Sequence, residues 1–142
     1  MITPENNPLY SNSQVMWTWC CDKIENKTAL DIGANQGGYS DSMLNHGFYV
    51  HAFEPVPDMF NEMSLFLSGR EKIILNQKGL SDHEYTLENL TVLNCWTLGV
   101  KDSGTAQALD YVDKPSFSVS FTTVDLYCQD IPIGLIKLDV DG

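Results

Sequence analysis

Along the chain, short runs of apolar residues alternate with segments whose apolar residues recur at helical spacing. The runs that are typical of buried strands cover residues 29–32, 48–53, 72–76 and 134–140. Helical spacing before and between these runs predicts helices over residues 13–26, 39–46 and 57–67. Strands that alternate with helices favour a parallel sheet with right-handed crossovers. We therefore expect an α/β fold.

Residues 83–127 break this rhythm. They contain three short runs with strand character, a turn at 101–104 and a short helix at 123–128, and the runs cover residues 85–87, 91–93 and 117–121. We interpret the region as an antiparallel excursion before the fourth core strand, rather than as a second domain. The chain then divides into a loose, polar N-terminal arm, residues 1–12, and one domain, residues 13–142.

The first helix has an apolar stripe that we expect to face the core. Its members are Val15, Met16, Trp19, Cys20 and Ile24. Trp17 falls outside this stripe, and we expect it to cover the edge of the sheet.

The amino-acid composition limits which classes of partner are expected. The 142 residues carry 8 basic and 19 acidic side chains, a net charge of -11, which disfavours nucleic acid and anionic membranes as partners. The first residues are polar and no apolar run reaches the roughly 18 residues of a membrane span. The four cysteines form no CxxC pair, which favours reduced thiols and a cytoplasmic protein. No set of Asp and His residues has metal-ligand spacing, so we expect no metal.

The strand at residues 29–32 runs into a glycine-rich turn. Gly33 allows a sharp turn, Asn35 tolerates left-handed backbone angles, and Gly37 permits a close approach. The next strand ends at Glu54, about twenty residues further on. This order of strand, glycine turn, helix, strand and carboxylate is typical of the first half of a nucleoside-cofactor site.

Asp31 indicates which nucleoside cofactor is bound. A carboxylate at this place repels the pyrophosphate of a dinucleotide, whereas it attracts the ammonium and sulfonium of S-adenosylmethionine. Glu54 can accept hydrogen bonds from ribose hydroxyls in either case. The pattern thus favours S-adenosylmethionine and leaves a NAD-dependent oxidoreductase as the alternative. After the third strand, Ser81 and Asp82 either bond the adenine edge or form a plain turn.

Five segments together resemble the FkbM family of methyltransferases. They are Asp31-Ile32-Gly33-Ala34-Asn35-Gln36-Gly37, Ala52-Phe53-Glu54-Pro55, Gly79-Leu80-Ser81-Asp82, Thr123-Val124-Asp125 and Ile136-Lys137-Leu138-Asp139-Val140-Asp141-Gly142. The resemblance implies a Rossmann-like class I sheet with strand order 3-2-1-4 and methyl transfer from S-adenosylmethionine to a hydroxyl oxygen of a small molecule or glycan. The expected cofactor-binding residues are Asp31, Gly33, Ala34, Asn35, Gly37, Glu54, Ser81 and Asp82.

Asp139 and Asp141 are the candidate catalytic residues. They follow the fourth strand two positions apart and therefore point to one side, where they can orient an acceptor hydroxyl or take its proton. The alternative for Asp139 is a turn cap or a pair with Lys137, which we expect to reach solvent. We expect His51 to be a hydrogen-bonded core histidine.

The chain departs from the family pattern near its last residue. The family usually has Glu at the position of Asp141 and continues beyond Gly142, so we expect a partial methyltransferase domain from an incomplete sequence. The fourth strand would then be an open apolar edge, a template for pairing with another chain. A homodimer through this edge, or a non-catalytic module that pairs through it, is the further alternative.

Overall fold

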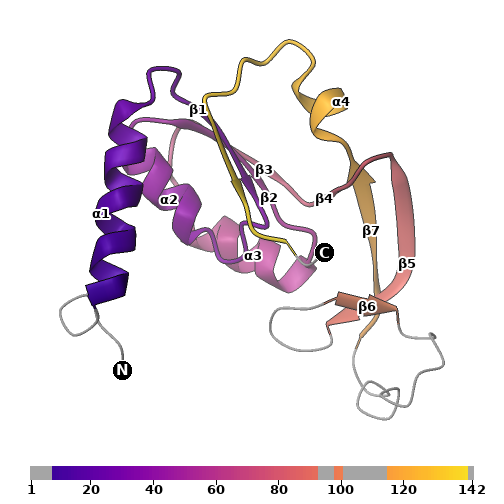
Figure 1. Cartoon of the computed structure of the whole chain (residues 1–142). Helices are drawn as coiled ribbons and strands as arrows, with labels where there is room; N and C mark the ends of the chain where they lie inside the picture. The colour runs from indigo at the N-terminus through magenta and orange to yellow at the C-terminus, as the bar shows by residue number, and fades with distance from the viewer. Residues whose placement is uncertain (1–7, 93–97, 101–114, 141–142) are drawn as a thin grey trace.

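Four parallel strands form the central sheet of the computed structural model, which describes residues 8–92, 98–100 and 115–140 (Figure 1). In spatial order they are β3 (Ile73–Asn76), β2 (Tyr49–Phe53), β1 (Thr28–Ile32) and β8 (Leu135–Leu138). All three strand pairs are parallel. The expected strand order 3-2-1-4 and the α/β class are confirmed.

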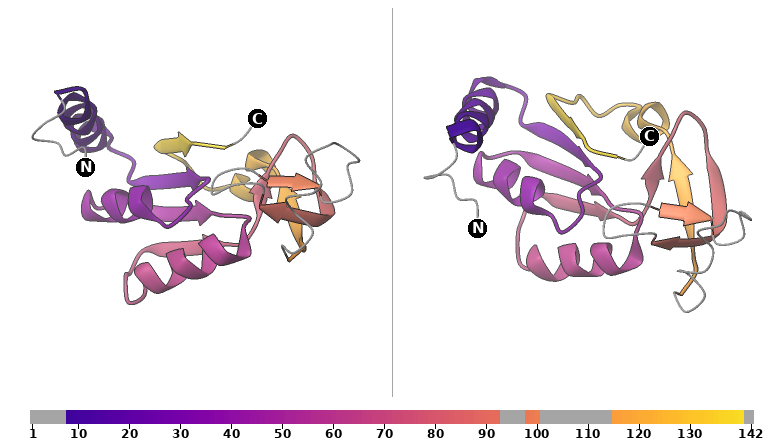
Figure 2. Two further views of the ribbon diagram at one scale, coloured as in Figure 1. Left: turned by 90° about the horizontal axis from the view of Figure 1, so that it is seen from below. Right: turned by 60° about the horizontal axis from the view of Figure 1, so that its bottom comes forward.

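Helices cover the two faces of this sheet unequally. On one face lie α1 (Pro8–Lys23), α2 (Gly38–Asn45) and α3 (Pro57–Phe66), and α4 (Val124–Cys128) lies against the other (Figure 2). Side chains alternate along each strand, so Ala29, Val50 and Ala52 pack toward α2 and α3. Leu30, Ile32 and Phe53 point the opposite way, toward α4.

The excursion between β3 and β8 forms a second four-stranded sheet. Its order is β4 (Gly79–Leu80), β7 (Phe117–Thr122), β5 (Tyr85–Val92) and β6 (Leu98–Val100). β5 is antiparallel to β6 and β7, as expected, whereas β4 runs parallel to β7. The two strands expected at 85–87 and 91–93 are one strand with an irregularity between Leu87 and Leu90. The turn expected at 101–104 lies outside the described residues.

Both the start and the orientation of α1 differ from the sequence-based expectation. The helix begins at Pro8, so residues 8–12 are helical and not part of an arm. Val15, Met16 and Trp19 are exposed, and the expected inward stripe is therefore wrong. Apolar side chains occur all around α1, so its spacing does not select a face.

Trp17, which lay outside the expected stripe, instead joins α1 to α2. Its Nε1 donates a hydrogen bond to Ser42 Oγ at 2.9 Å, and its indole meets the Tyr39 ring edge-on at 5.0 Å. Cys21, one turn further along the helix, is buried in the core. The face of α1 that packs is therefore the one that carries Trp17 and Cys21.

His51 is a hydrogen-bonded core histidine, as expected. It is buried on β2, and its Nδ1 lies 2.8 Å from Tyr127 Oη on α4. Burial lowers the pKa of His51 because the charged imidazolium loses hydration. Asn76 donates to the same Tyr127 hydroxyl at 3.2 Å, which completes a polar link between β2, β3 and α4.

The described cysteines, the helices and the edge of the central sheet each bear on a separate expectation from the sequence. Cys20, Cys21 and Cys128 are free thiols, and Cys95 lies outside the described residues. Across the described ranges, none of the helices has both the length and the apolarity to cross a membrane. β8 is the edge strand of its sheet, with Ile136 and Leu138 exposed, and pairing through this edge stays a prediction.

Candidate functional site

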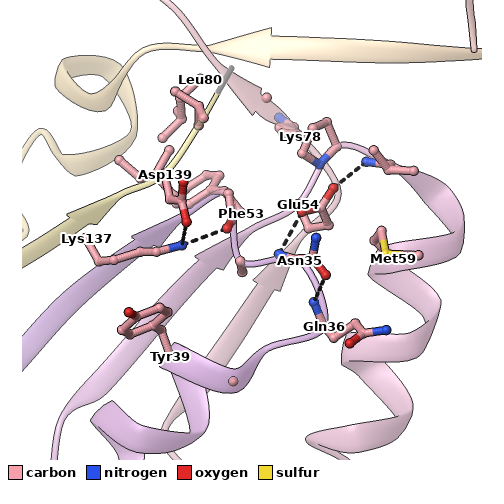
Figure 3. A pocket seen from close by; sticks show the side chains of 18 of the residues that line it. Asn35, Gln36, Tyr39, Phe53, Glu54, Met59, Lys78, Leu80, Lys137 and Asp139 are labelled. Atoms are coloured by element: carbon pink, nitrogen blue, oxygen red, sulfur yellow. Dashed lines mark hydrogen bonds and ion pairs between the residues drawn. The ribbon is translucent and has the colours of Figure 1, made fainter. Parts of the chain in front are cut away.

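A cleft of about 1810 Å³ opens at the carboxyl ends of β1, β2 and β8 (Figure 3). One wall is the glycine turn with Glu54, and another is the second sheet with Leu80, Tyr85 and Phe121. In parallel α/β sheets, ligands bind at this end of the strands, where the strand order reverses. The cleft exceeds the roughly 300–1,000 Å³ of a typical ligand site, so it has room for a cofactor and a second molecule.

The glycine turn is fastened to the neighbouring strand. The N–H groups of Gly33 and Ala34 both donate to the carbonyl of Phe53, at 3.0 and 2.9 Å. Gly33 has φ +75° and Asn35 has φ +51°, so both adopt the left-handed backbone that the sequence predicts for them. The turn thereby presents residues 33–36 to the cleft.

Glu54 lies next to this turn, almost completely buried, with 5% of the residue exposed. Its Oε2 accepts the Asn35 N–H and its Oε1 accepts the Val56 N–H, each at 2.8 Å. Burial raises the pKa of Glu54, and the two backbone hydrogen bonds act against that rise. Each carboxylate oxygen keeps a second lone pair, so Glu54 can also accept two ribose hydroxyls.

Asp31 lies behind the wall of the cleft and does not line it. The side chain is fully buried, and its Oδ2 accepts the Ser40 hydroxyl at 2.7 Å. Lys137 Nζ lies 3.2 Å from Asp31 Oδ1. This corrects the electrostatic reasoning from sequence, which gave Asp31 an unpaired charge that faces the cofactor. The charge is balanced inside the protein.

Lys137 is the site residue that sequence reasoning missed. We expected it to reach solvent, which is wrong, because only 11% of its side chain is exposed. Its Nζ donates to the Gly33 carbonyl at 2.8 Å and lies 3.8 Å from Asp139 Oδ2. The order 3-2-1-4 makes β1 and β8 neighbours but does not fix their register, and the structure shows that Lys137 lies level with Asp31.

The structure brings four of the eight expected cofactor residues together at the cleft. Gly33, Ala34, Asn35 and Glu54 line it, and so does the candidate catalytic residue Asp139. Gly37 does not line the cleft, since a Cβ there would lie 2.9 Å from the Leu67 side chain. Its role is close packing of the turn against α3.

The loop after β3 is placed differently from the expectation. Lys78, Gly79 and Leu80 line the cleft, whereas Ser81 and Asp82 lie beyond it. The Ser81 N–H bonds the carbonyl of Thr122, and Asp82 is exposed beside His83. Contact of Ser81 and Asp82 with adenine stays a prediction, as does the role of Asp141, which lies outside the described residues.

The charges and shape of the cleft fit S-adenosylmethionine. Glu54, Asp58, Glu62 and Asp139 line it, against the cations of Lys78 and Lys137, and Lys137 is already paired with Asp31. This acidic balance suits a sulfonium and an ammonium, and disfavours a diphosphate. Apolar side chains of Ile32, Phe53 and Leu80 line the same cleft and suit an adenine ring. Among the residues placed by the structure, no three His, Cys, Asp or Glu side chains could jointly hold a metal ion.

The fold and the site together define a Rossmann-like domain that binds a nucleoside cofactor. The model of the methyltransferase FkbM domain matches residues 31–142, and the chain belongs to this family. S-adenosylmethionine is therefore its cofactor and methyl transfer its activity, as the sequence favoured over a nicotinamide cofactor.

A crystal structure assigned as an S-adenosylmethionine-dependent methyltransferase from Listeria monocytogenes is 13% identical, with a TM-score of 0.37. The similarity covers 82% of this chain and 81% of that chain. No curated protein matches the sequence.

Proposed function

We propose that the domain methylates a hydroxyl oxygen of a small molecule or glycan. The observation that carries this proposal is the position of Asp139. Its carboxylate lines the cleft directly after β8, and 78% of its side chain is exposed. A carboxylate so placed can accept the hydrogen bond of an acceptor hydroxyl and hold its proton.

The carboxylates around the site differ in how far they are already engaged. Asp31 is buried and paired with Lys137, and both oxygens of Glu54 accept backbone N–H groups. Within the described ranges, the carboxylate of Asp139 accepts no hydrogen bond, and its single ionic contact is Lys137, 3.8 Å away. Of these three, Asp139 is therefore the carboxylate best suited to a molecule that enters from solvent.

The far wall of the cleft supports an acceptor with a flat, uncharged face. Tyr85 and Phe121 line it and stack at a centroid distance of 4.5 Å with an interplanar angle of 8°. Such an aromatic surface packs against the apolar face of a sugar or macrocycle ring. Trp96 and Tyr111, two further aromatic residues of the excursion, lie outside the described residues.

The chemistry assigns distinct tasks to the residues of the site. Glu54 and the glycine turn would hold the cofactor, and Asp139 would orient the acceptor. When bound, the cofactor supplies a methyl group that the acceptor oxygen takes as the carbon–sulfur bond breaks. Asp139 would hold the hydroxyl proton, with an expected rate contribution of about 10²–10⁴-fold. We place this reaction in the cytoplasm, since the described cysteines are free thiols.

The test is a transfer assay with S-adenosylmethionine labelled in its methyl group. Sugars and hydroxylated macrolides serve as acceptors, alongside analogues in which an amine or a carboxylate replaces the hydroxyl. We expect label in the hydroxylated compounds, in a form that resists mild base because ethers do not hydrolyse as esters do. Label confined to amines or to base-labile esters would contradict the proposal.

A pair of variants tests the role of Asp139. Asp139→Asn should lower the transfer rate by about 10²-fold and leave the affinity for S-adenosylhomocysteine unchanged. Asp130→Asn removes an exposed carboxylate from the loop before β8 and should transfer at the wild-type rate. Equal rates in both variants would exclude Asp139 from proton transfer.

A further inference from the structure

The ammonium of Lys137 lies between the cofactor turn and the acceptor-side carboxylate (Figure 3). We propose that Lys137 is a positioning residue, which holds the turn and Asp139 at a set separation for methyl transfer. This inference rests on the proposed function, because it takes Asp139 as the group that orients the acceptor. Lys137 contacts neither reacting atom and acts through the turn and Asp139.

Three oxygens surround Lys137 Nζ. The Gly33 carbonyl accepts a hydrogen bond at 2.8 Å, Asp31 Oδ1 lies at 3.2 Å and Asp139 Oδ2 at 3.8 Å. The contact with the Gly33 carbonyl is a hydrogen bond, and those with the two carboxylates are ion pairs. The contacts therefore connect β1, the turn that follows it, and the end of β8.

Burial makes this arrangement rigid. Asp31 is fully buried and is held from its other side by Ser40 of α2, at 2.7 Å. The centroid of the Tyr39 ring lies 5.1 Å from Lys137 Nζ, a cation–π contact. Charges that are shielded from water interact more strongly than exposed ones. The head of Lys137 is thus held from several sides before any ligand binds.

Two contacts place Asp139, one through its backbone and one through its carboxylate. The Asp139 N–H donates to the Ile32 carbonyl at 3.0 Å, which fixes the position of the Asp139 backbone. Its carboxylate, however, contacts Lys137 alone within the described residues. Lys137 therefore determines where the carboxylate points. A reacting group displaced by about 1 Å can lose about 10²-fold in rate.

A purely structural role for the Asp31–Lys137 pair makes a different prediction. Removing one member of a buried ion pair leaves an uncompensated charge, whereas replacing both members by neutral groups is often tolerated. The double variant Asp31→Asn/Lys137→Met therefore separates stability from positioning. It leaves neither member of the pair as an uncompensated buried charge, and it lacks the ammonium that connects the turn to Asp139.

The experiment compares wild type, Lys137→Met, the double variant and the exposed control Lys23→Met. The readouts are the melting temperature, hydrogen exchange of the amides of residues 33–37 without ligand, and the methyl-transfer rate. We expect Lys137→Met to melt lower and the double variant to recover most of that loss. In the double variant the turn amides should still exchange about tenfold faster. Its transfer rate should stay about 10²-fold below wild type.

Wild-type exchange and a wild-type rate in the double variant would overturn the inference. Hydrogen exchange is measured in each protein at the same number of degrees below its own melting temperature. A double variant that melts low therefore still shows whether Lys137 holds the turn. A wild-type chain that methylates no hydroxylated compound contradicts the proposed function. In that case exchange at residues 33–37 still shows whether Lys137 holds the turn. Lys23→Met should match wild type in every readout.

Discussion

The backbone N–H of Asn35 donates to Glu54 Oε2 at 2.8 Å, which joins the glycine turn after β1 to the carboxylate after β2. One contact thereby connects the two sequence segments that we propose hold the cofactor. Glu54 orients the turn through this hydrogen bond, and the turn in exchange holds the carboxylate at the cleft wall.

Replacing Glu54 by Ala should weaken the binding of S-adenosylhomocysteine by at least about tenfold. The loss follows from removed hydrogen bonds to a charged group, each worth about 1.5–3 kcal/mol. Titration calorimetry at pH 7.5 measures the affinity. Glu71→Ala removes an exposed carboxylate at the opposite end of the sheet and should bind as wild type does. Equal affinities would show that Glu54 does not contact the ligand.

Gly33→Ala should destabilise the fold by about 2 kcal/mol or more. A Cβ at Gly33 would lie 2.0 Å from the Asp139 carbonyl oxygen, and its φ of +75° disfavours any side chain. Gly38→Ala is the matched control, since a Cβ there meets no heavy atom within 4 Å. That variant should be as stable as wild type or gain up to about 1 kcal/mol. Denaturant unfolding of both variants measures the difference.

Acidification should destabilise the fold through His51. Burial lowers its pKa in the folded chain, so the unfolded chain binds more protons just below the usual histidine pKa of 6.5. The free energy of unfolding therefore falls as the pH decreases through 6.5, by at most about 1.4 kcal/mol per pH unit for this group. The raised pKa of Glu54 has the opposite sign, with stability lost as the pH rises through its folded value.

Comparison with His51→Gln isolates the histidine contribution. Glutamine can still bond the Tyr127 hydroxyl, and Glu54 is present in both proteins, so its contribution cancels. Unfolding curves at pH 7.5 and 5.5 should show a smaller fall for His51→Gln than for wild type. His83→Gln keeps His51 and should keep the full fall. Identical falls in wild type and His51→Gln would contradict this assignment.

The two tryptophans of α1 should differ in their contribution to stability. Trp17→Ala removes a side chain that packs on the core and bonds Ser42, and should lower the free energy of unfolding by about 2–3 kcal/mol. Trp19 is exposed, and Trp19→Ala should change the free energy by no more than about 0.5 kcal/mol. Similar losses in the two variants would show that α1 packs through its other face.

Much of the fold and site follows from local patterns. The runs of apolar residues gave the core strands to within a residue or two at most ends, since burial on both faces leaves a continuous signal. Gly33 and Asn35 were placed by their backbone requirements, and Glu54 by its spacing. The pairing of β4 with β7 was not predicted, because a two-residue strand has no periodicity to read.

The sequence by itself determined the left-handed turn and the carboxylate beside it, because each depends on residues close together in the chain. The strand order followed from the resemblance to the FkbM family. Only the tertiary structure decided that Asp31 is neutralised by Lys137, that α1 packs through Trp17, and that Ser81 lies beyond the cleft. These relations depend on how strands and helices distant in sequence come into contact. A charge looks unpaired, and a helix face looks buried, until its neighbours are in place.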